Sequence, residues 1–169
     1  MDVGGTDAPL DANLMPYITV IAPNESELGF ISGVQPAEGG EWDAATLRKA
    51  VGALKGQFAE VGNPDVEVLV TLGKNGACLY GARWSAESAE AHELQVDAVP
   101  GVKPLDTCGA GDCFRGAFVG ARYGEGRGAM EAMEWAAAAG SLAVEVEGAM
   151  PSMPTRAQIS ERLADAKKR

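Results

Sequence analysis

The 169-residue chain has the length of about one domain and is 46% hydrophobic, so it can build a core without disulfides or metals, and its 22 glycines lack the strict period of collagen. Its 14 basic and 24 acidic residues give a formal charge of −10, which disfavours binding to nucleic acid or to an anionic membrane surface. The three cysteines have no C-x-x-C spacing and indicate neither a zinc site nor a disulfide framework.

The first predicted elements are a strand and a short helix. Residues 17–22 form an apolar, β-branched run with the length of a buried strand, and Pro23 ends it. Asn24 and Glu27 have the spacing of a capping box. We therefore expect a short helix that begins here and runs toward Gly33.

A longer helix and three more strands follow. Asp43 can cap a helix whose apolar residues recur at steps of three and four. Residues 66–71 predict a second buried strand, residues 73–76 a turn, residues 77–80 a third strand, and residues 92–99 a fourth. The apolar face of the helix consists of Leu47, Ala50, Val51, Leu54, Phe58 and Val61.

The last part of the sequence predicts helices only. The glycine-rich residues 109–112 open one helix, and an Ala- and Met-rich helix runs from 127 to 144, with Gly140 at a tight contact between helices. Thr155 and Gln158 cap a final helix that ends in basic residues. Strands that alternate with helices and then give way to helices favour an α/β layered domain.

The stretch with the most chemical content is Asp106-Thr107-Cys108-Gly109-Ala110-Gly111-Asp112. Small residues at a helix start let consecutive backbone N–H groups point at an anion, and the helix dipole adds to the attraction. Asp112 would repel a phosphate unless it has a task of its own, such as accepting the proton of an attacking hydroxyl. The alternative is that Asp112 caps its helix. Other phosphate motifs fail on spacing, because Phe114 stands where G-x-G-x-x-G requires its third glycine and no P-loop lysine follows.

Residues 106–118 closely resemble the second signature of the PfkB carbohydrate kinases, the ribokinase-like family. Residues 23–27 look like the family's Asn-Glu-x-Glu motif, residues 70–76 like its nucleotide-binding strand and turn, and residues 148–154 like its C-terminal loop. The first and last of these three are most similar to the ribokinase branch. The resemblance implies an α/β fold: the C-terminal portion of a three-layer α/β/α sandwich, without the N-terminal strands and lid.

By this resemblance, Asp112 is the catalytic base that takes the proton from a sugar hydroxyl as it attacks the γ-phosphate of ATP. Glu27, together with Asn24, acts on Mg²⁺ through water, because Mg²⁺ keeps part of its hydration shell; the alternative for Glu27 is the capping box alone. The backbone amides implied to form the anion hole are those of Gly109, Ala110, Gly111 and Asp112. The residues implied to line the nucleotide are Asn24, Thr71, Gly73, Gly76 and Ala137.

The resemblance also implies a monovalent cation such as K⁺ beside the anion hole. Residues 145–147 depart from the family here, because they read Glu-Val-Glu where relatives often carry Thr and basic residues. Cys108 and Cys113 are interpreted as small packing residues. The matching cation ligands are the Asp106 carboxylate, the carbonyls of Cys108, Ala143, Val146 and Gly148, and Ser152.

The family's N-terminal part supplies its first, Gly-Gly signature and most sugar contacts, and no counterpart is found here. We therefore expect residues 1–169 to be the C-terminal, nucleotide-binding part of an ATP-dependent sugar kinase that acts on a primary hydroxyl, ribose being the first candidate. Alternatives are a nucleotide-binding module without turnover, or a relative acting on fructose, a nucleoside or another alcohol. A homodimer of a full-length protein stays open.

The location expected from the sequence is cytoplasmic. No Lys or Arg precedes Arg48, which argues against a secretory or organellar presequence. The longest uncharged run, residues 12–24, contains prolines and is too short to span a bilayer. We expect neither a membrane nor a nucleic-acid partner.

Overall fold

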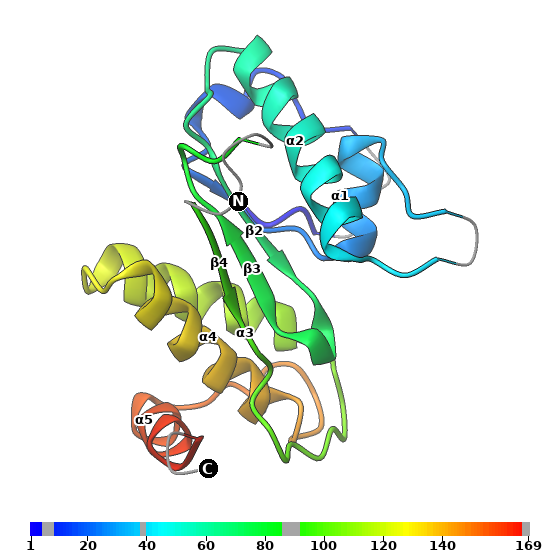
Figure 1. The fold of residues 1–169 in the computed structure, drawn as a ribbon. Coiled ribbons are helices and arrows are strands. Elements are labelled where there is room, and N and C mark those ends of the chain that lie inside the picture. The colour runs from blue at the N-terminus through cyan, green and yellow to red at the C-terminus, as the bar shows by residue number, and fades with distance from the viewer. Residues whose placement is uncertain (5–8, 38–39, 86–91, 167–169) are drawn as a thin grey trace. The chain divides into compact units, whose positions relative to one another are not determined.

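The computed structural model describes residues 1–4, 9–37, 40–85 and 92–166 (Figure 1). The chain divides into two compact units, which are described separately. The N-terminal unit comprises Met1–Leu72 and Cys78–Leu94, and the C-terminal unit comprises Gly73–Ala77 and Gln95–Arg169.

The parallel part of the sheet is short. Strand β1 (Val20–Ile21) pairs in parallel with β2 (Glu67–Thr71). The prediction of a strand over residues 17–22 is therefore correct in place but too long at its start. Met15–Tyr17 form a 3₁₀ turn instead, with a proline in its first positions, and the Tyr17 side chain is 84% exposed. The fixed backbone angle of the proline favours a helical turn over a strand at this point.

The other two predicted strands are present. The strands lie in the order β1-β2-β3-β4, where β3 is Ala77–Tyr80 and β4 is Glu93–Val96. The connection from β2 to β3 contains a single 3₁₀ turn, Gly73–Asn75, and so short a link between neighbouring strands makes an antiparallel hairpin. The fourth strand is shorter than the predicted 92–99.

Two helices pack in the N-terminal unit, α1 (Glu25–Ser32) and α2 (Ala44–Glu60), and they contact each other (Figure 1). The carboxylate of Asp43 accepts a hydrogen bond from the Thr46 amide at 2.8 Å, so the predicted cap is confirmed. The predicted apolar face is confirmed from Leu47 to Phe58, whereas Val61, its last predicted residue, lies just after the helix and is only half-buried. The large side chains of this core include Leu28, Leu54, Phe58, Val66, Val68, Tyr80 and Trp84.

Lys55 lies on the buried face of α2 with only 8% of its surface exposed. Its ammonium group donates to the carbonyl oxygens of Val66, Gly81 and Ala82, at 2.6, 3.0 and 3.2 Å. Burial lowers the pKa of this lysine, and the three carbonyls satisfy the charged form. Lys55 thereby ties α2 to the start of β2 and to the segment after β3.

The C-terminal unit is helical, as predicted. Helix α3 (Ala110–Val119) continues into a π-helical turn over Gly120–Gly124, and α4 (Ala129–Ala143) packs against it. At Gly140 a Cβ atom would stand 3.6 Å from the Cβ of Phe114, which is ordinary van der Waals contact. The helices are therefore close here, but the expectation of an especially tight contact is wrong, because a methyl group would fit.

The final helix, α5 (Arg156–Ala166), begins with the predicted capping pair. The side-chain oxygen of Gln158 accepts from the Thr155 amide at 2.8 Å. The basic residues 167–169 at its predicted end lie outside the described residues. None of the helices in the described ranges is long and apolar enough to cross a membrane.

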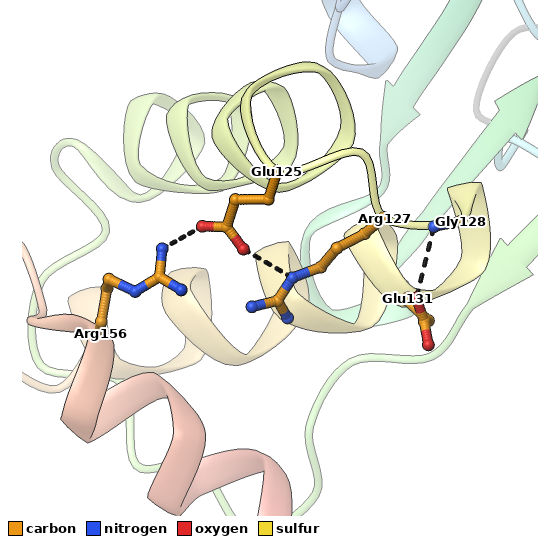
Figure 2. A network of polar contacts seen from close by, with 5 residues as sticks. All are labelled: Glu125, Arg127, Gly128, Glu131 and Arg156. Atoms are coloured by element: carbon orange, nitrogen blue, oxygen red, sulfur yellow. Dashed lines mark hydrogen bonds and ion pairs between the residues drawn. The ribbon is translucent and has the colours of Figure 1, made fainter.

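A polar network closes the segment between α3 and α4 against α5 (Figure 2). Glu125 accepts from Arg127 at 2.8 Å and also pairs with Arg156. The Arg127 guanidinium lies 4.2 Å from the centre of the Trp135 ring, a cation–π contact. Glu131 accepts from the Gly128 amide at 3.3 Å, which closes the start of α4. These contacts fix surface segments to one another, although each exposed ion pair contributes only about 0.2–1 kcal/mol.

Candidate functional site

The carboxyl ends of β1 and β2 bring two of the predicted nucleotide residues together. Asn24 follows β1 and forms a parallel bridge with Thr71, the last residue of β2. The Thr71 amide donates to the Pro23 carbonyl at 3.1 Å. Ligands of open α/β sheets bind outside the carboxyl ends of parallel strands, so this edge of the N-terminal unit has the position of a binding site.

Asn24 and Glu27 form a complete capping box at the start of α1. The Asn24 side chain accepts from the Glu27 amide at 2.8 Å, and the Glu27 carboxylate accepts from the Asn24 amide at 2.9 Å. The capping interpretation of this pair is confirmed. A role of Glu27 toward Mg²⁺ stays a prediction, which the capping bond through Oε2 does not test.

The two glycines of the β2–β3 turn differ in their surroundings. A Cβ atom at Gly76, whose φ is 83°, would stand 1.9 Å from the carbonyl oxygen of Val96 in β4. Gly73 is exposed and has no atom within 4 Å of such a Cβ. Close approach of the β4 backbone is therefore sufficient to explain the glycine at position 76. At position 73 no protein atom crowds the glycine, so a ligand has room to approach the backbone there.

The amino end of α3 is open. Gly109 is the N-cap residue with φ of 77°, and no side chain caps the helix among the described residues. The Ala110 amide donates to the Thr107 carbonyl at 3.2 Å. Gly111 and Asp112 occupy the next two positions, where backbone amides have no intrahelical acceptor. Such a terminus attracts an anion through its amides and its dipole.

Asp112 lies in the first turn of α3 with 65% of its side chain exposed. Its Oδ1 atom pairs with Nη2 of Arg115 at 3.0 Å. The alternative that Asp112 caps its helix is wrong, because the N-cap residue is Gly109. Arg115 was not predicted as a site residue, although its spacing of three residues from Asp112 is typical of an ion pair on a helix.

Asp106 connects two loops of the C-terminal unit. Its Oδ1 accepts from the Cys108 amide at 2.9 Å, and its Oδ2 accepts from the Gly148 amide at 2.8 Å. These two hydrogen bonds lower the pKa of the carboxyl group, the bond from Cys108 contributing most. The loop before α3 is thus fixed to the loop before α5.

Several of the predicted cation ligands lie near Asp106. The Asp106 amide donates to the Val144 carbonyl at 3.2 Å, which places it beside the end of α4. The Gly148 carbonyl accepts from the Ser152 amide at 3.3 Å, and the Ser152 hydroxyl donates to the Ala149 carbonyl at 2.7 Å. These internal bonds leave second lone pairs on the carbonyl oxygens. Across residues 1–4, 9–37, 40–85 and 92–166, no three His, Cys, Asp or Glu side chains gather to hold a metal.

The remaining predicted residues lie on α3 and α4, just before α3 or, in the case of Val146, just after α4. Ala137 is part of the buried stretch of α4. Cys113 is buried, and desolvation raises the pKa of its thiol, as expected of a packing residue. Cys108 is exposed, so its interpretation as a packing residue is wrong. Asn24, Glu27 and Thr71 belong to the N-terminal unit, and the other predicted site residues belong to the C-terminal unit.

Comparison with known proteins gives a family and several relatives. Residues 6–156 match the pfkB family of carbohydrate kinases. A ribokinase of Arabidopsis thaliana is 35% identical over 165 residues, which cover 96% of this chain and 38% of that protein. The solved structure of Arabidopsis thaliana ribokinase complexed with ribose and ATP is 34% identical with a TM-score of 0.78, covering 96% of this chain and 46% of the other. A putative ribokinase II from E. coli, solved in complex with ATP and Mg²⁺, is 28% identical with a TM-score of 0.67, covering 91% of this chain and 42% of the other.

The chain spans less than half the length of these relatives. The family match nevertheless includes both the strand edge at Asn24 and the helix start at Gly109. The chain belongs to the PfkB family of carbohydrate kinases, and its described residues build part of the ribokinase-like α/β fold.

Proposed function

We propose that residues 1–169 are the C-terminal, nucleotide-binding part of an ATP-dependent kinase that phosphorylates a primary hydroxyl of a sugar, with ribose as the first candidate. The observation that carries the proposal is the open amino end of α3, where a glycine N-cap precedes a first turn containing Asp112. An uncapped helix start favours a phosphate, and the adjacent carboxylate can receive a proton. Membership of the PfkB family supports this combination.

The reaction assigns one task to each part of this helix start. The sugar hydroxyl oxygen forms a bond to the γ-phosphorus of ATP, and its proton passes to the Asp112 carboxylate. The bond between the γ-phosphorus and the β–γ bridging oxygen breaks, and its electron pair leaves with ADP. The amides of Gly109, Ala110, Gly111 and Asp112 stabilise the charge on the transferred group, the main contribution of a protein to phosphoryl transfer.

We also assign residues to the nucleotide and to its metal ion. Glu27 would hold Mg²⁺ through water, because Mg²⁺ keeps part of its hydration shell. Bound Mg²⁺ would neutralise charge on the phosphate oxygens. The E. coli relative solved with ATP and Mg²⁺ supports both ligands. The residues proposed to contact the nucleotide are Asn24, Thr71, Gly73, Gly76 and Ala137.

A monovalent cation such as K⁺ completes the proposal. The Asp106 carboxylate and the carbonyl oxygens around it are hard oxygen donors of the kind such an ion prefers. The loop that contains Gly148 is fixed to Asp106, which keeps these donors together. The proposed ligands are Asp106, Cys108, Ala143, Val146, Gly148 and Ser152.

Replacement of the proposed base tests the function. In a complete protein that contains residues 1–169, Asp112→Asn keeps the size of the side chain but cannot accept the proton, so we expect turnover to fall by about 10²–10⁴-fold while MgATP binding persists. A coupled ADP assay with ribose measures turnover, and calorimetry measures binding. The control is Glu131→Gln, another exposed first-turn acid of the same unit. Near-normal turnover of the Asp112 variant would remove the assignment.

The second candidate is a nucleotide-binding module without turnover of its own. It is favoured by the coverage of the relatives, of which the chain spans less than half. Calorimetry with MgATP followed by the ADP assay separates the two candidates, because a module binds the nucleotide without sugar-dependent ADP release. The assay with fructose, a nucleoside and ribose in parallel identifies the alcohol that is accepted.

A further inference from the structure

Arg115 is a charged residue of α3 that the proposed reaction does not use. Its side chain is only 16% exposed, whereas that of its partner Asp112 is 65% exposed. The arginine is therefore the anchored member of the pair and the aspartate the solvent-facing one. An anchored cation can fix the orientation of an exposed carboxylate, which would otherwise change rotamer freely.

The guanidinium group reaches back toward the start of the helix. Side chains on a helix lean toward its amino end, so a residue covers the turn before it. In agreement, a Cβ atom on Gly111 would stand 3.2 Å from Nη2 and 3.5 Å from Cζ of Arg115. The glycine at this position leaves room for the guanidinium beside the first-turn amides.

The contact between the two side chains involves one carboxylate oxygen. Nη2 of Arg115 donates to Oδ1 of Asp112 at 3.0 Å. With Oδ1 engaged, rotation of the carboxylate is restricted, and Oδ2 is the oxygen left to meet an incoming hydroxyl. Correct aim matters, because a misplacement of about 1 Å in a reacting group can cost a factor of about 10² in rate.

We propose that Arg115 is a positioning residue that holds the Asp112 carboxylate through Oδ1 and presents Oδ2 to the substrate hydroxyl. The inference rests on the proposed function and extends it. A helical ion pair of this spacing adds little to folding, so its loss is separable from unfolding. Because Arg115 acts through Asp112, its removal lowers kcat and leaves the KM for ATP unchanged.

The test is a double-mutant cycle on kcat with Arg115→Gln and Asp112→Asn, made in a complete protein that contains residues 1–169. We expect Arg115→Gln to lower kcat by about 10–100-fold, with KM for ATP within about twofold, and Arg115→Lys to restore part of the loss. In the Asp112→Asn background, Arg115→Gln has no further effect, because the group it positions is gone. The control Arg156→Gln breaks another ion pair of the C-terminal unit, with Glu125, and leaves kcat within about twofold (Figure 2).

Three results would overturn the proposal. They are wild-type kcat in Arg115→Gln, a full additional loss in the Asp112→Asn background, and a raised KM for ATP in place of a lowered kcat, which would make Arg115 a phosphate ligand. A second measurement needs no turnover: the side-chain χ1 couplings of Asp112, measured by NMR. They should indicate one fixed rotamer in the unchanged protein and rotamer averaging in Arg115→Gln, and unchanged couplings contradict the proposal.

The same design distinguishes this inference from the function on which it rests. Absence of turnover in a complete protein that contains residues 1–169, with every sugar tested, overturns the proposed enzyme activity. The NMR comparison still decides whether Arg115 holds Asp112. Turnover in that complete protein together with an unaffected Arg115→Gln variant overturns the positioning role alone.

Discussion

Helices α1 and α3 both follow segments with predicted nucleotide or phosphate residues, but their amino ends differ. At α1, the Asn24 side chain and the Glu27 carboxylate each accept a backbone amide, so the start of the helix is closed. At α3, the N-cap residue is Gly109 and no side chain of the described residues accepts an amide. The first amides of α1 are therefore satisfied by side chains of the same helix start, whereas those of α3 are left for a ligand.

This difference separates stability from function along the chain. A side-chain cap typically contributes about 1 kcal/mol to stability, and a glycine at the N-cap position loses only part of this contribution. At α3 the acid of the first turn pairs with Arg115 instead of capping the helix. The chain therefore places its stabilising cap at the strand edge and its open amides beside the carboxylate.

The largest expected effect on stability comes from a side chain introduced at the open amino end of α3. Gly109→Ala forces a side chain into a left-handed residue and places its Cβ 2.9 Å from the Cβ of Ala149, so we expect a loss of about 2–4 kcal/mol in the free energy of unfolding. Gly33→Ala is the matched control at the end of α1: its φ of 72° is similar, but no atom lies within 4 Å, so the loss is about 1 kcal/mol.

Urea unfolding followed by tryptophan fluorescence measures both variants. Trp135 reports on the C-terminal unit that contains Gly109, and Trp42 and Trp84 report on the N-terminal unit that contains Gly33. Equal losses at the two glycines would show that the contact with Ala149 does not limit the substitution. Weaker MgATP binding in Gly109→Ala alone would support the open helix start as the phosphate site.

Removal of the cap at α1 has the next largest effect. Asn24→Ala deletes the acceptor of the Glu27 amide and should cost about 1 kcal/mol, within the range of 0.5–2 kcal/mol for lost N-caps. Asn24→Asp is the control, because an aspartate accepts the same amide and should retain most of the stability. Thermal unfolding of the three proteins provides the comparison, and an alanine variant as stable as the parent would contradict a closed helix start.

The sequence was sufficient where local chemistry decides the structure. The capping boxes of α1 and α5, the cap at Asp43 and the three-to-four periodicity of α2 all follow from neighbours in the chain, and the structure confirms them. The predicted strand start at Tyr17 was wrong, because the β-branched run alone defined it and the proline before Tyr17 favours a helical turn. The hydrogen bonds of Asp106 to Gly148 and of Lys55 to three carbonyls join distant segments, which no local pattern specifies.

Acid should loosen the loop that precedes the open helix start. The lowered pKa of Asp106 means that its stabilisation is complete above the ordinary value of 3.8 and is lost as the pH falls through the pKa of the folded state. Asp106→Asn lacks this charge and cannot accept from both amides. Its deficit in stability relative to the parent should therefore be largest near neutral pH and shrink below about pH 4. Urea midpoints across this range measure it, and a constant deficit would contradict the hydrogen bonds as the cause.

The smallest effect on stability is expected at Glu27, where it separates capping from metal binding. Glu27→Gln keeps a side-chain oxygen that can accept from the Asn24 amide, so the free energy of unfolding should change by less than about 0.5 kcal/mol. The charge is lost, however, and a water-mediated contact with Mg²⁺ weakens, so the Mg²⁺ concentration for half-maximal ADP binding should rise severalfold. Calorimetry at graded Mg²⁺ tests this. An unchanged Mg²⁺ dependence would show that Glu27 only caps its helix. Of the acidic residues proposed for the site, Asp106 and Asp112 at the open start of α3 would then remain.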